Sequence, residues 1–221
     1  MEVHQDLFRN IVSLRESEDL FDDLSDDPNA WQAAQKLEFE TKPRFFTSPT
    51  PAIYRPFEEA EWNTAIGYPF TELSVTRFSD GSFGVWYGAD ELETTIYETV
   101  HHWKNGLFAD AGFSQSGIEI QRRVYKVRCD AALIDLRASI RDYPNLVHST
   151  DYSLTHEIGT RIHREGHPGL ITKSARADGD VEAVFNPEVL SNPQHHCYLT
   201  YITTSSGIEI QREKGTVLLR I

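Results

Sequence analysis

Short alternations of apolar and polar residues dominate the chain after residue 70, and they predict many short β-strands. The predicted strands are Ala52–Arg55, Leu73–Arg77, Val85–Ala89, Val124–Arg128, Ala132–Leu136, Gly169–Ser174, Val181–Phe185, Tyr198–Thr203, Ile208–Gln211 and Val217–Ile221. Strands and helices do not alternate regularly, so a doubly wound parallel sheet is not expected. The pattern predicts an α+β fold with many short strands and few helices.

Two stretches in this strand-rich part have apolar residues at helical spacing instead. The first lies between Asp90, which forms a capping box with Glu93, and the stop signal Gly106. Its apolar face consists of Leu92, Ile96, Val100 and Trp103. The second predicted helix lies between Asp151 as a start signal and Gly166 as a stop signal.

The first fifth of the chain has a different character. Apolar residues recur there at helical spacing on both sides of an acidic stretch. These residues are Leu7, Ile11 and Leu14, then Trp31, Ala34 and Leu37. A proline-punctuated linker follows. We therefore predict an acidic helical accessory segment over residues 1–48, as a packed cap or a docking element, and a main domain over residues 49–221.

Charge and composition narrow the classes of function. The chain has 34 acidic and 21 basic residues and a net charge of −13, which disfavours binding to nucleic acid. No apolar run approaches the ~20 residues of a membrane span, and the N-terminus lacks the pattern of a signal peptide. Two cysteines provide no disulfide framework. A cytoplasmic protein that does not bind membranes is expected.

Searches for widespread catalytic motifs give no match. The chain lacks the phosphate-binding G-x-x-x-x-G-K-[ST], the dinucleotide G-x-G-x-x-G, the nucleophile motif G-x-S-x-G and the zinc motif H-E-x-x-H. The adjacent pairs His101-His102 and His195-His196 are poorly spaced to chelate one ion. No metal site is predicted.

One glutamate stands out on the first predicted helix. Glu98 lies between the apolar-face residues Ile96 and Val100, so it is expected to be partly buried. A buried carboxylate requires a partner or serves a function. The helix follows a glycine-spaced turn and an aromatic strand that runs from Arg77 to Tyr87. Glu98 is therefore a candidate functional residue, with a surface ion pair as the alternative.

Several short pieces around Glu98 resemble, in order and spacing, the RES-domain family of toxins from bacterial RES/Xre-type toxin–antitoxin systems. The pieces are Ile53-Tyr54-Arg55, the stretch from Arg77 to Tyr87, Glu98, Tyr152-Ser153, and Gly169 to Arg176 ahead of Val184-Phe185-Asn186-Pro187. The resemblance covers roughly residues 50–190. It implies a fold like that of ADP-ribosyltransferase toxins and a reaction that consumes NAD+ or transfers ADP-ribose from it.

The resemblance also implies roles for individual side chains. Arg55 matches the family arginine and is expected to bind the diphosphate of NAD+. Glu98 matches the glutamate and is expected to stabilise a ribosyl cation. Ser153 matches the serine and is expected to orient the substrate, although it also suits a helix cap. Ser174 is a rival for the same role.

Aromatic and basic side chains complete the implied site. Tyr87 and Tyr54 offer faces on which nicotinamide stacks. Many family members have a Gly-Gly-Arg-Trp turn where this chain has Phe83-Gly84-Val85-Trp86. If the arginine of that turn helps to hold substrate, Arg77 must replace it here.

The expected function is that of an NAD+-consuming toxin. It cleaves the nicotinamide–ribose bond as a glycohydrolase or a phosphorylase and depletes cellular NAD+. NAD+ is then the substrate, no metal is needed, and a cognate Xre-like antitoxin blocks the site. The alternatives are a protein ADP-ribosyltransferase toxin and a non-catalytic domain that binds a nucleotide or a partner. A homo-oligomer is compatible with the sequence.

One repeat has no functional interpretation. The heptapeptide Ser-Gly-Ile-Glu-Ile-Gln-Arg occurs at residues 116–122 and again at 206–212. The flanking sequences differ, so the two copies are predicted to be similar turn-then-strand pieces rather than units of a repeat architecture.

Overall fold

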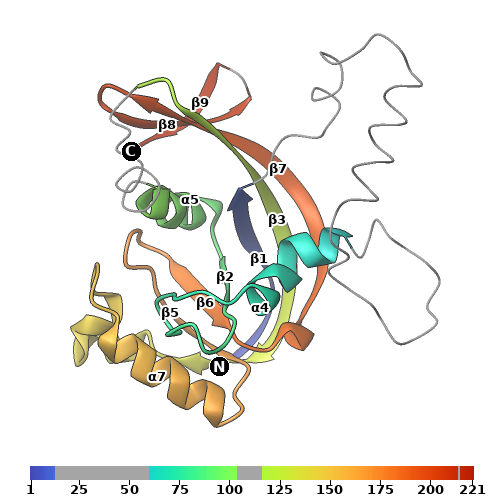
Figure 1. The fold of residues 1–221 in the computed structure, drawn as a ribbon, viewed down its shortest axis with the longest axis vertical. Helices are drawn as coiled ribbons and strands as arrows, with labels where there is room; N and C mark the ends of the chain where they lie inside the picture. The colour runs from blue at the N-terminus through green and yellow to red at the C-terminus, as the bar shows by residue number, and fades with distance from the viewer. Residues whose placement is uncertain (13–59, 104–115, 214) are drawn as a thin grey trace, which may run out of the picture.

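A computed structural model describes residues 1–12, 60–103, 116–213 and 215–221 of the chain. These residues form a curved sheet of nine strands in the order β4-β5-β6-β2-β1-β3-β7-β8-β9, with few helices (Figure 1). The strands are β1 (Glu2–Val12), β2 (Trp86–Ala89), β3 (Glu119–Ala132), β4 (Ile134–Asp135), β5 (Gly169–Lys173), β6 (Asp180–Val184), β7 (Leu190–Thr204), β8 (Gly207–Glu213) and β9 (Thr216–Arg220). All neighbours except β4 and β5 are antiparallel. The expected α+β class is confirmed.

The sheet has a long part and a short part that meet at a weak seam. In the long part, β1 pairs with β3 over eleven consecutive residue pairs, from Glu2↔Ala132 to Val12↔Arg122. In the short part, β2 pairs with β6 over its whole length. At the seam, β1 and β2 share the single residue pair Phe8↔Ala89. Beyond this pair, no described strand pairs with the edge of β1 that faces β2.

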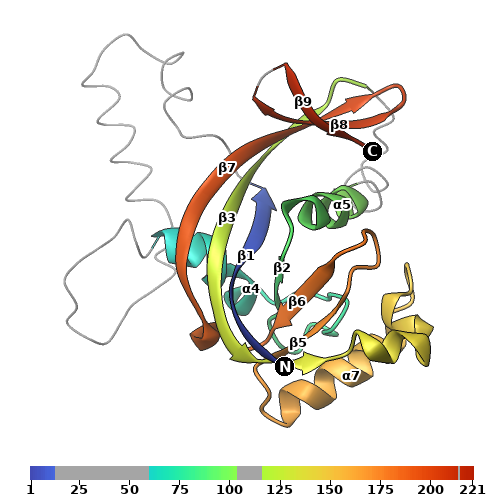
Figure 2. The same cartoon turned by 180° about the vertical axis from the view of Figure 1, so that it is seen from behind.

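Two helices of three or more turns lie where the sequence predicts them. α5 (Leu92–His102) lies in the concave side of the sheet, and α7 (Ser153–Arg164) lies beside the short part (Figure 2). Gly166 has φ +80° and ends α7 as expected. The predicted capping box at Asp90 does not form, because the carboxylate accepts instead from the backbone N–H of Asp180 at 3.4 Å.

Short helical turns join these elements. They are η1 (Asn63–Gly67), α4 (Tyr68–Thr71), η3 (Ala138–Arg141), η4 (Pro144–Val147) and η5 (Pro187–Val189). Ala65 and Ile66 of η1 pack with Leu7 and Trp86 in one buried cluster. Buried residues of α5, β3, β7 and β8 form a second cluster. The sheet around the seam is thus held by apolar packing of α5 and by that of η1.

The N-terminal residues correct one prediction. The sequence predicts a helix around Leu7 and Ile11, but residues 2–12 form β1 in the interior of the sheet. A spacing of four residues places side chains on one face of a strand as well as on one face of a helix. Val3, Leu7 and Ile11 accordingly pack in one cluster. The rest of the predicted accessory segment lies outside the described residues.

A second correction concerns the loop before β2. Leu73–Arg77 is not a strand, and its pairing is limited to an isolated bridge between Thr76 and Ser79. The backbone folds back on itself there, since the N–H of Thr76 donates to the carbonyl of Ser79 at 2.8 Å. The predicted strand Ala52–Arg55 lies outside the described residues.

The repeated heptapeptide has a structural explanation. The two copies lie on opposite sides of β7, in β3 and in β8, and pair with the same β7 residues. Ile120 and Ile210 both face Tyr201 in register, and Gln121 and Gln211 both face Thr200. Ile210 and Ile208 are buried in the α5 cluster, against which Ile118 and Ile120 also pack. The isoleucines of each copy therefore pack in the same apolar cluster, and each copy pairs with the same strand.

Candidate active site

A cavity of about 490 Å³ opens at the seam of the sheet. Its walls come from β1, β2, α5, the loop before β2, the start of α7 and the turn after β5. Residues far apart in the sequence meet here because β1 and β2 share only one residue pair at the seam. The volume lies in the range of small-molecule sites.

Glu98 enters this cavity from α5 and is held by Ser174. The Ser174 hydroxyl donates to Oε1 of Glu98 at 2.5 Å and accepts from the backbone N–H groups of Arg176 and Ala177, both at 3.0 Å. Because these two N–H groups occupy the lone pairs of Oγ, its single proton points at Glu98. Oε2 of Glu98 has no hydrogen-bond partner among the described residues. The carboxylate is fixed in orientation and keeps one oxygen for a ligand.

Close packing brings Ser174 to α5. The turn between β5 and β6 contains Gly179, and a Cβ at that position would lie 2.1 Å from Oγ1 of Thr94. The N–H of Ser174 donates to the carbonyl of Gly179 at 2.8 Å and closes the turn. Only glycine permits this approach, so the turn places Ser174 beside Glu98.

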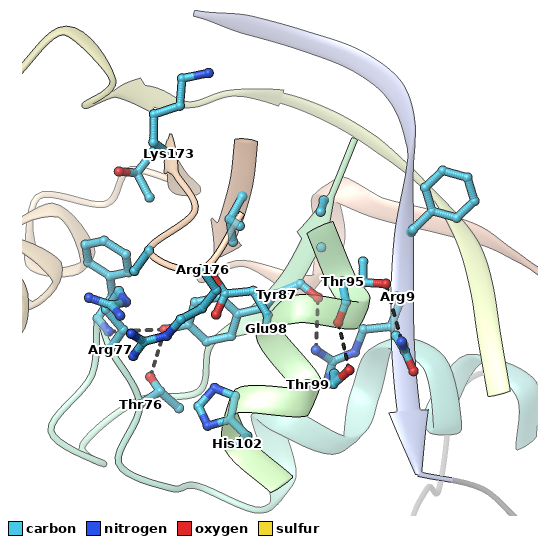
Figure 3. A pocket seen from close by; sticks show the side chains of 18 of the residues that line it. Arg9, Thr76, Arg77, Tyr87, Thr95, Glu98, Thr99, His102, Lys173 and Arg176 are labelled. Atoms are coloured by element: carbon cyan, nitrogen blue, oxygen red, sulfur yellow. Dashed lines mark hydrogen bonds between the residues drawn. The ribbon is translucent and has the colours of Figure 1, made fainter. Parts of the chain in front are cut away.

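Two arginines face Glu98 across the cavity, Arg77 from the loop before β2 and Arg176 from the turn after β5 (Figure 3). Arg77 donates to the carbonyl of His148 at 2.8 Å and lies over the ring of Tyr152, 4.7 Å from its centroid. Arg176 donates to the carbonyl of Ser149, and its buried Nε has no hydrogen-bond partner among the residues that the structure describes. Burial lowers the pKa of Arg77. Backbone carbonyls orient both guanidinium groups without neutralising them.

Arg9 supplies a third guanidinium, which the sequence analysis missed. It reaches the cavity from β1 and donates through Nη1 to the carbonyl of Tyr87 at 2.9 Å, and its buried Nε has no hydrogen-bond partner in the described part of the chain. Burial, aided by the charge of Arg122, lowers the pKa of Arg9 to about 10, so the group stays protonated at neutral pH. Its signal in the sequence is a charged residue between Leu7 and Ile11 on the apolar face of a strand.

Tyr87 lines the cavity from β2 and is held at its hydroxyl. The hydroxyl accepts from the N–H of Phe78 at 3.1 Å and donates to Oγ1 of Thr76 at 3.0 Å. Burial raises its pKa to about 12, so the phenol is neutral. The loop before β2 is fixed in turn by His156, whose Nε2 lies 2.8 Å from the carbonyl oxygen of Thr76.

The structure therefore brings together four of the predicted site residues. Glu98, Tyr87 and Arg77 line the cavity, and Ser174 lies directly behind Glu98. Ser153 lies elsewhere. It is exposed at the start of α7, where its hydroxyl donates to Asp151 at 2.7 Å, and it does not line the cavity. Tyr54 and Arg55 lie outside the described residues.

Two further observations concern residues 1–12, 60–103, 116–213 and 215–221 alone. Within these ranges, no group of three histidine, cysteine or acidic side chains is arranged to hold a metal ion. None of the helices that the structure describes is long and apolar enough to cross a membrane.

Comparisons with known proteins identify the family to which the chain belongs. No curated protein sequence matches the chain. Among solved structures, it is similar to the crystal structure of the M. tuberculosis MbcT–MbcA toxin–antitoxin complex, with 11% identity, a TM-score of 0.49, and coverage of 90% of this chain and 85% of that one. The family model of the RES domain matches residues 52–204. This match spans well over half of the sequence, and the chain belongs to the RES-domain family.

Proposed function

We propose that the protein consumes NAD+ by cleaving the bond between nicotinamide and ribose, and that it acts in the cytoplasm as the toxin of a toxin–antitoxin pair. Its membership of the RES-domain family supports this role. The cognate partner in this proposal is an antitoxin that covers the cavity.

The observation that carries the proposal is the charge pattern of the cavity. Three arginines and a single glutamate line it, in a protein whose net charge is −13. Arg9, Arg77 and Arg176 form no ion pair with a carboxylate among the described residues. Partly buried positive charge without a counter-ion is costly, and a ligand with a dianionic diphosphate brings negative charge into this cavity. NAD+ carries that diphosphate beside a cationic nicotinamide ring.

Glu98 is suited to the reacting centre of such a ligand. Cleavage of the nicotinamide–ribose bond develops positive charge on the ribose, as in glycoside hydrolysis. A carboxylate held in place by Ser174 stabilises that charge and accepts a hydrogen bond from a ribose hydroxyl through Oε2. In this proposal Ser174, rather than Ser153, has the role of the family serine, because Ser174 contacts Glu98.

The bond changes are simple. The C–N bond breaks, and nicotinamide leaves with the electron pair as a neutral molecule. Water or inorganic phosphate then forms a new C–O bond at the same carbon. Water loses a proton to solvent and gives ADP-ribose, whereas phosphate gives ADP-ribose-1″-phosphate. Tyr87 lies in the cavity with a neutral phenol and provides the aromatic face against nicotinamide.

The proposal is tested by following NAD+ and its products by NMR with purified full-length protein, with and without phosphate. We expect NAD+ loss and release of nicotinamide. Loss that depends on phosphate identifies a phosphorylase, and loss without phosphate identifies a glycohydrolase. Intact NAD+ under both conditions would contradict the proposal and direct the search to a protein acceptor or to a binding role.

A further inference from the structure

A second cavity of about 510 Å³ adjoins the first at the seam. The two cavities share Arg9 and Asn10 of β1 as a common wall. Beyond this wall, the second cavity is lined by Ile11 and Val12 and by residues of η1 and α4. Both cavities therefore lie along β1, the first beside Phe8 to Asn10 and the second beside Arg9 to Val12.

The junction between the cavities has an excess of positive charge. Arg122 lines the second cavity and donates to Oδ1 of Asn10 at 2.7 Å and to the Asn10 carbonyl at 2.9 Å. Asn10 is held from its other side by donating to the Tyr201 hydroxyl at 3.0 Å. Arg9 and Arg122 are both partnered by neutral groups only, among the residues the structure describes. Two neighbouring cations without a carboxylate favour an anion at this point.

The far end of the second cavity suits a nucleobase. Tyr68 and Val12 line it and are 61% and 63% exposed, so an apolar surface faces solvent there. An aromatic ring on such a surface stacks on a flat heterocycle. The amide of Asn63 and the hydroxyl of Thr64 line the same cavity and supply polar groups for ribose or for the base edge.

We infer that the second cavity binds the adenosine half of the dinucleotide, while its diphosphate lies at the junction on Arg9 and Arg122. This inference rests on the proposed NAD+ function and extends it to a second subsite. A dinucleotide has two nucleosides joined by a diphosphate, and the seam offers two cavities that share Arg9, with Arg122 beside it in the second cavity. The second subsite then makes the enzyme select NAD+ over nicotinamide mononucleotide, which has the same scissile bond but no adenosine.

The test compares the steady-state kinetics of NAD+ and nicotinamide mononucleotide with full-length protein. Tyr68→Ala removes the stacking surface, and Thr64→Trp fills the cavity from an exposed position. We expect each variant to raise the KM for NAD+ about tenfold with little change in kcat. The KM for nicotinamide mononucleotide changes less than about twofold, because that substrate does not enter the second cavity. Tyr143→Ala is the matched control, since Tyr143 is 57% exposed and lines neither cavity.

Two results would overturn the inference: an unchanged KM for NAD+ in both variants, or equal kcat/KM for the two substrates in the unmodified protein. Calorimetry with ADP-ribose separates this failure from failure of the proposed function. If no NAD+ is cleaved but ADP-ribose binds about tenfold more weakly to the two variants than to Tyr143→Ala, the subsite stands and the proposed reaction does not. If ADP-ribose binds equally to all three variants, or does not bind, the subsite is wrong.

Discussion

The two parts of the sheet differ in what their residues do. In the long part, β1, β3 and β7 are 11, 14 and 15 residues long and pair almost continuously. In the short part, β2, β5 and β6 have four or five residues each and are joined by a tight turn and by loops. The short part and α5 provide Tyr87, Glu98 and Ser174, whereas the long part reaches the first cavity mainly through Arg9.

From this difference we expect the long part to determine stability and the short part to determine activity. Long antiparallel pairing and the buried apolar clusters fix the long part as a frame. The side chains of the short part are held one by one, by hydrogen bonds to carbonyls and hydroxyls and by the close approach at Gly179. Substitutions in the short part are therefore expected to change activity more than the free energy of unfolding, and those in the long part the reverse.

The largest effect is expected at Glu98. Glu98→Gln removes the negative charge that opposes the developing ribosyl cation, so the rate of NAD+ cleavage falls about a thousandfold. The melting temperature changes by less than about 2 °C, since the side chain is only partly buried. Glu93→Gln, an exposed change on the same helix, is the control and leaves the rate unchanged. Equal rates in all three proteins would remove Glu98 from the mechanism.

A smaller loss is expected at the serine behind Glu98. Ser174→Ala deletes the hydrogen bond to the carboxylate and leaves two N–H groups without an acceptor, which lowers kcat about ten- to a hundredfold. Ser153→Ala changes kcat less than about twofold, because Ser153 is exposed and contacts Asp151. Measuring kcat for both variants decides between the two serines. A larger loss at Ser153 would restore the assignment expected from the sequence.

A substitution at Arg9 tests whether the long part of the sheet contributes to substrate binding. Arg9→Gln removes the positive charge and replaces the guanidinium with a shorter polar amide, and we expect the KM for NAD+ to rise about tenfold. Arg128→Gln is the matched change on β3, where the guanidinium pairs with Asp130 at 3.1 Å on the surface. It leaves the kinetics unchanged and costs less than about 1 kcal/mol of stability. If both variants behave alike, Arg9 is a structural residue of the frame.

The last prediction concerns stability rather than activity and is an exception within the short part: Glu182 of β6 is fully buried, and neither of its oxygens has a hydrogen-bond partner among the described residues. Burial raises its pKa from 4.5 to about 8, with the charge of Asp90 acting in the same direction. The folded protein then binds more protons than the unfolded chain between these values, so the free energy of unfolding falls as pH rises through this window. The contribution is fully present below 4.5.

Urea unfolding at several pH values measures this effect. The slope it adds approaches about 1.4 kcal/mol per pH unit, and Glu182→Gln abolishes it because the amide does not titrate. Parallel pH profiles of the two proteins would show that Glu182 is not protonated in the fold.

Much of the fold was predictable because its signals are local. Helix α5 has an apolar face of Leu92, Ile96 and Val100, and helix α7 ends at a glycine with positive φ. β1 was not predictable from spacing, because Leu7 and Ile11 share a face in either a helix or a strand. Its partner strand β3 begins at Glu119, so only the three-dimensional structure identifies the pairing.

The family resemblance supplied Tyr87, Glu98 and Arg77, which line the cavity of the candidate site. The sequence did not predict those parts of the candidate site that depend on contacts between distant residues in the fold. Ser153 and Ser174 both lie in matching segments, and only the approach of Gly179 to Thr94 shows which serine reaches Glu98. Arg9 lies outside the stretch that resembles the family, and its role depends on the seam between β1 and β2.

The position of the two heptapeptide copies on either side of β7 also raises the question of which copy pairs with β7 first during folding. Both strands that pair with β7 carry the same seven-residue sequence, so side-chain preferences alone do not determine which of them pairs first. The copy in β8 follows β7 after the turn at Thr204–Gly207, whereas the copy in β3 is separated from β7 by α7, β5 and β6. Closing a short loop costs less entropy and is faster than closing a long one. We therefore expect the β7–β8 hairpin to form early and the β3 copy to dock onto it late, so that chain connectivity, not sequence, sets the arrangement.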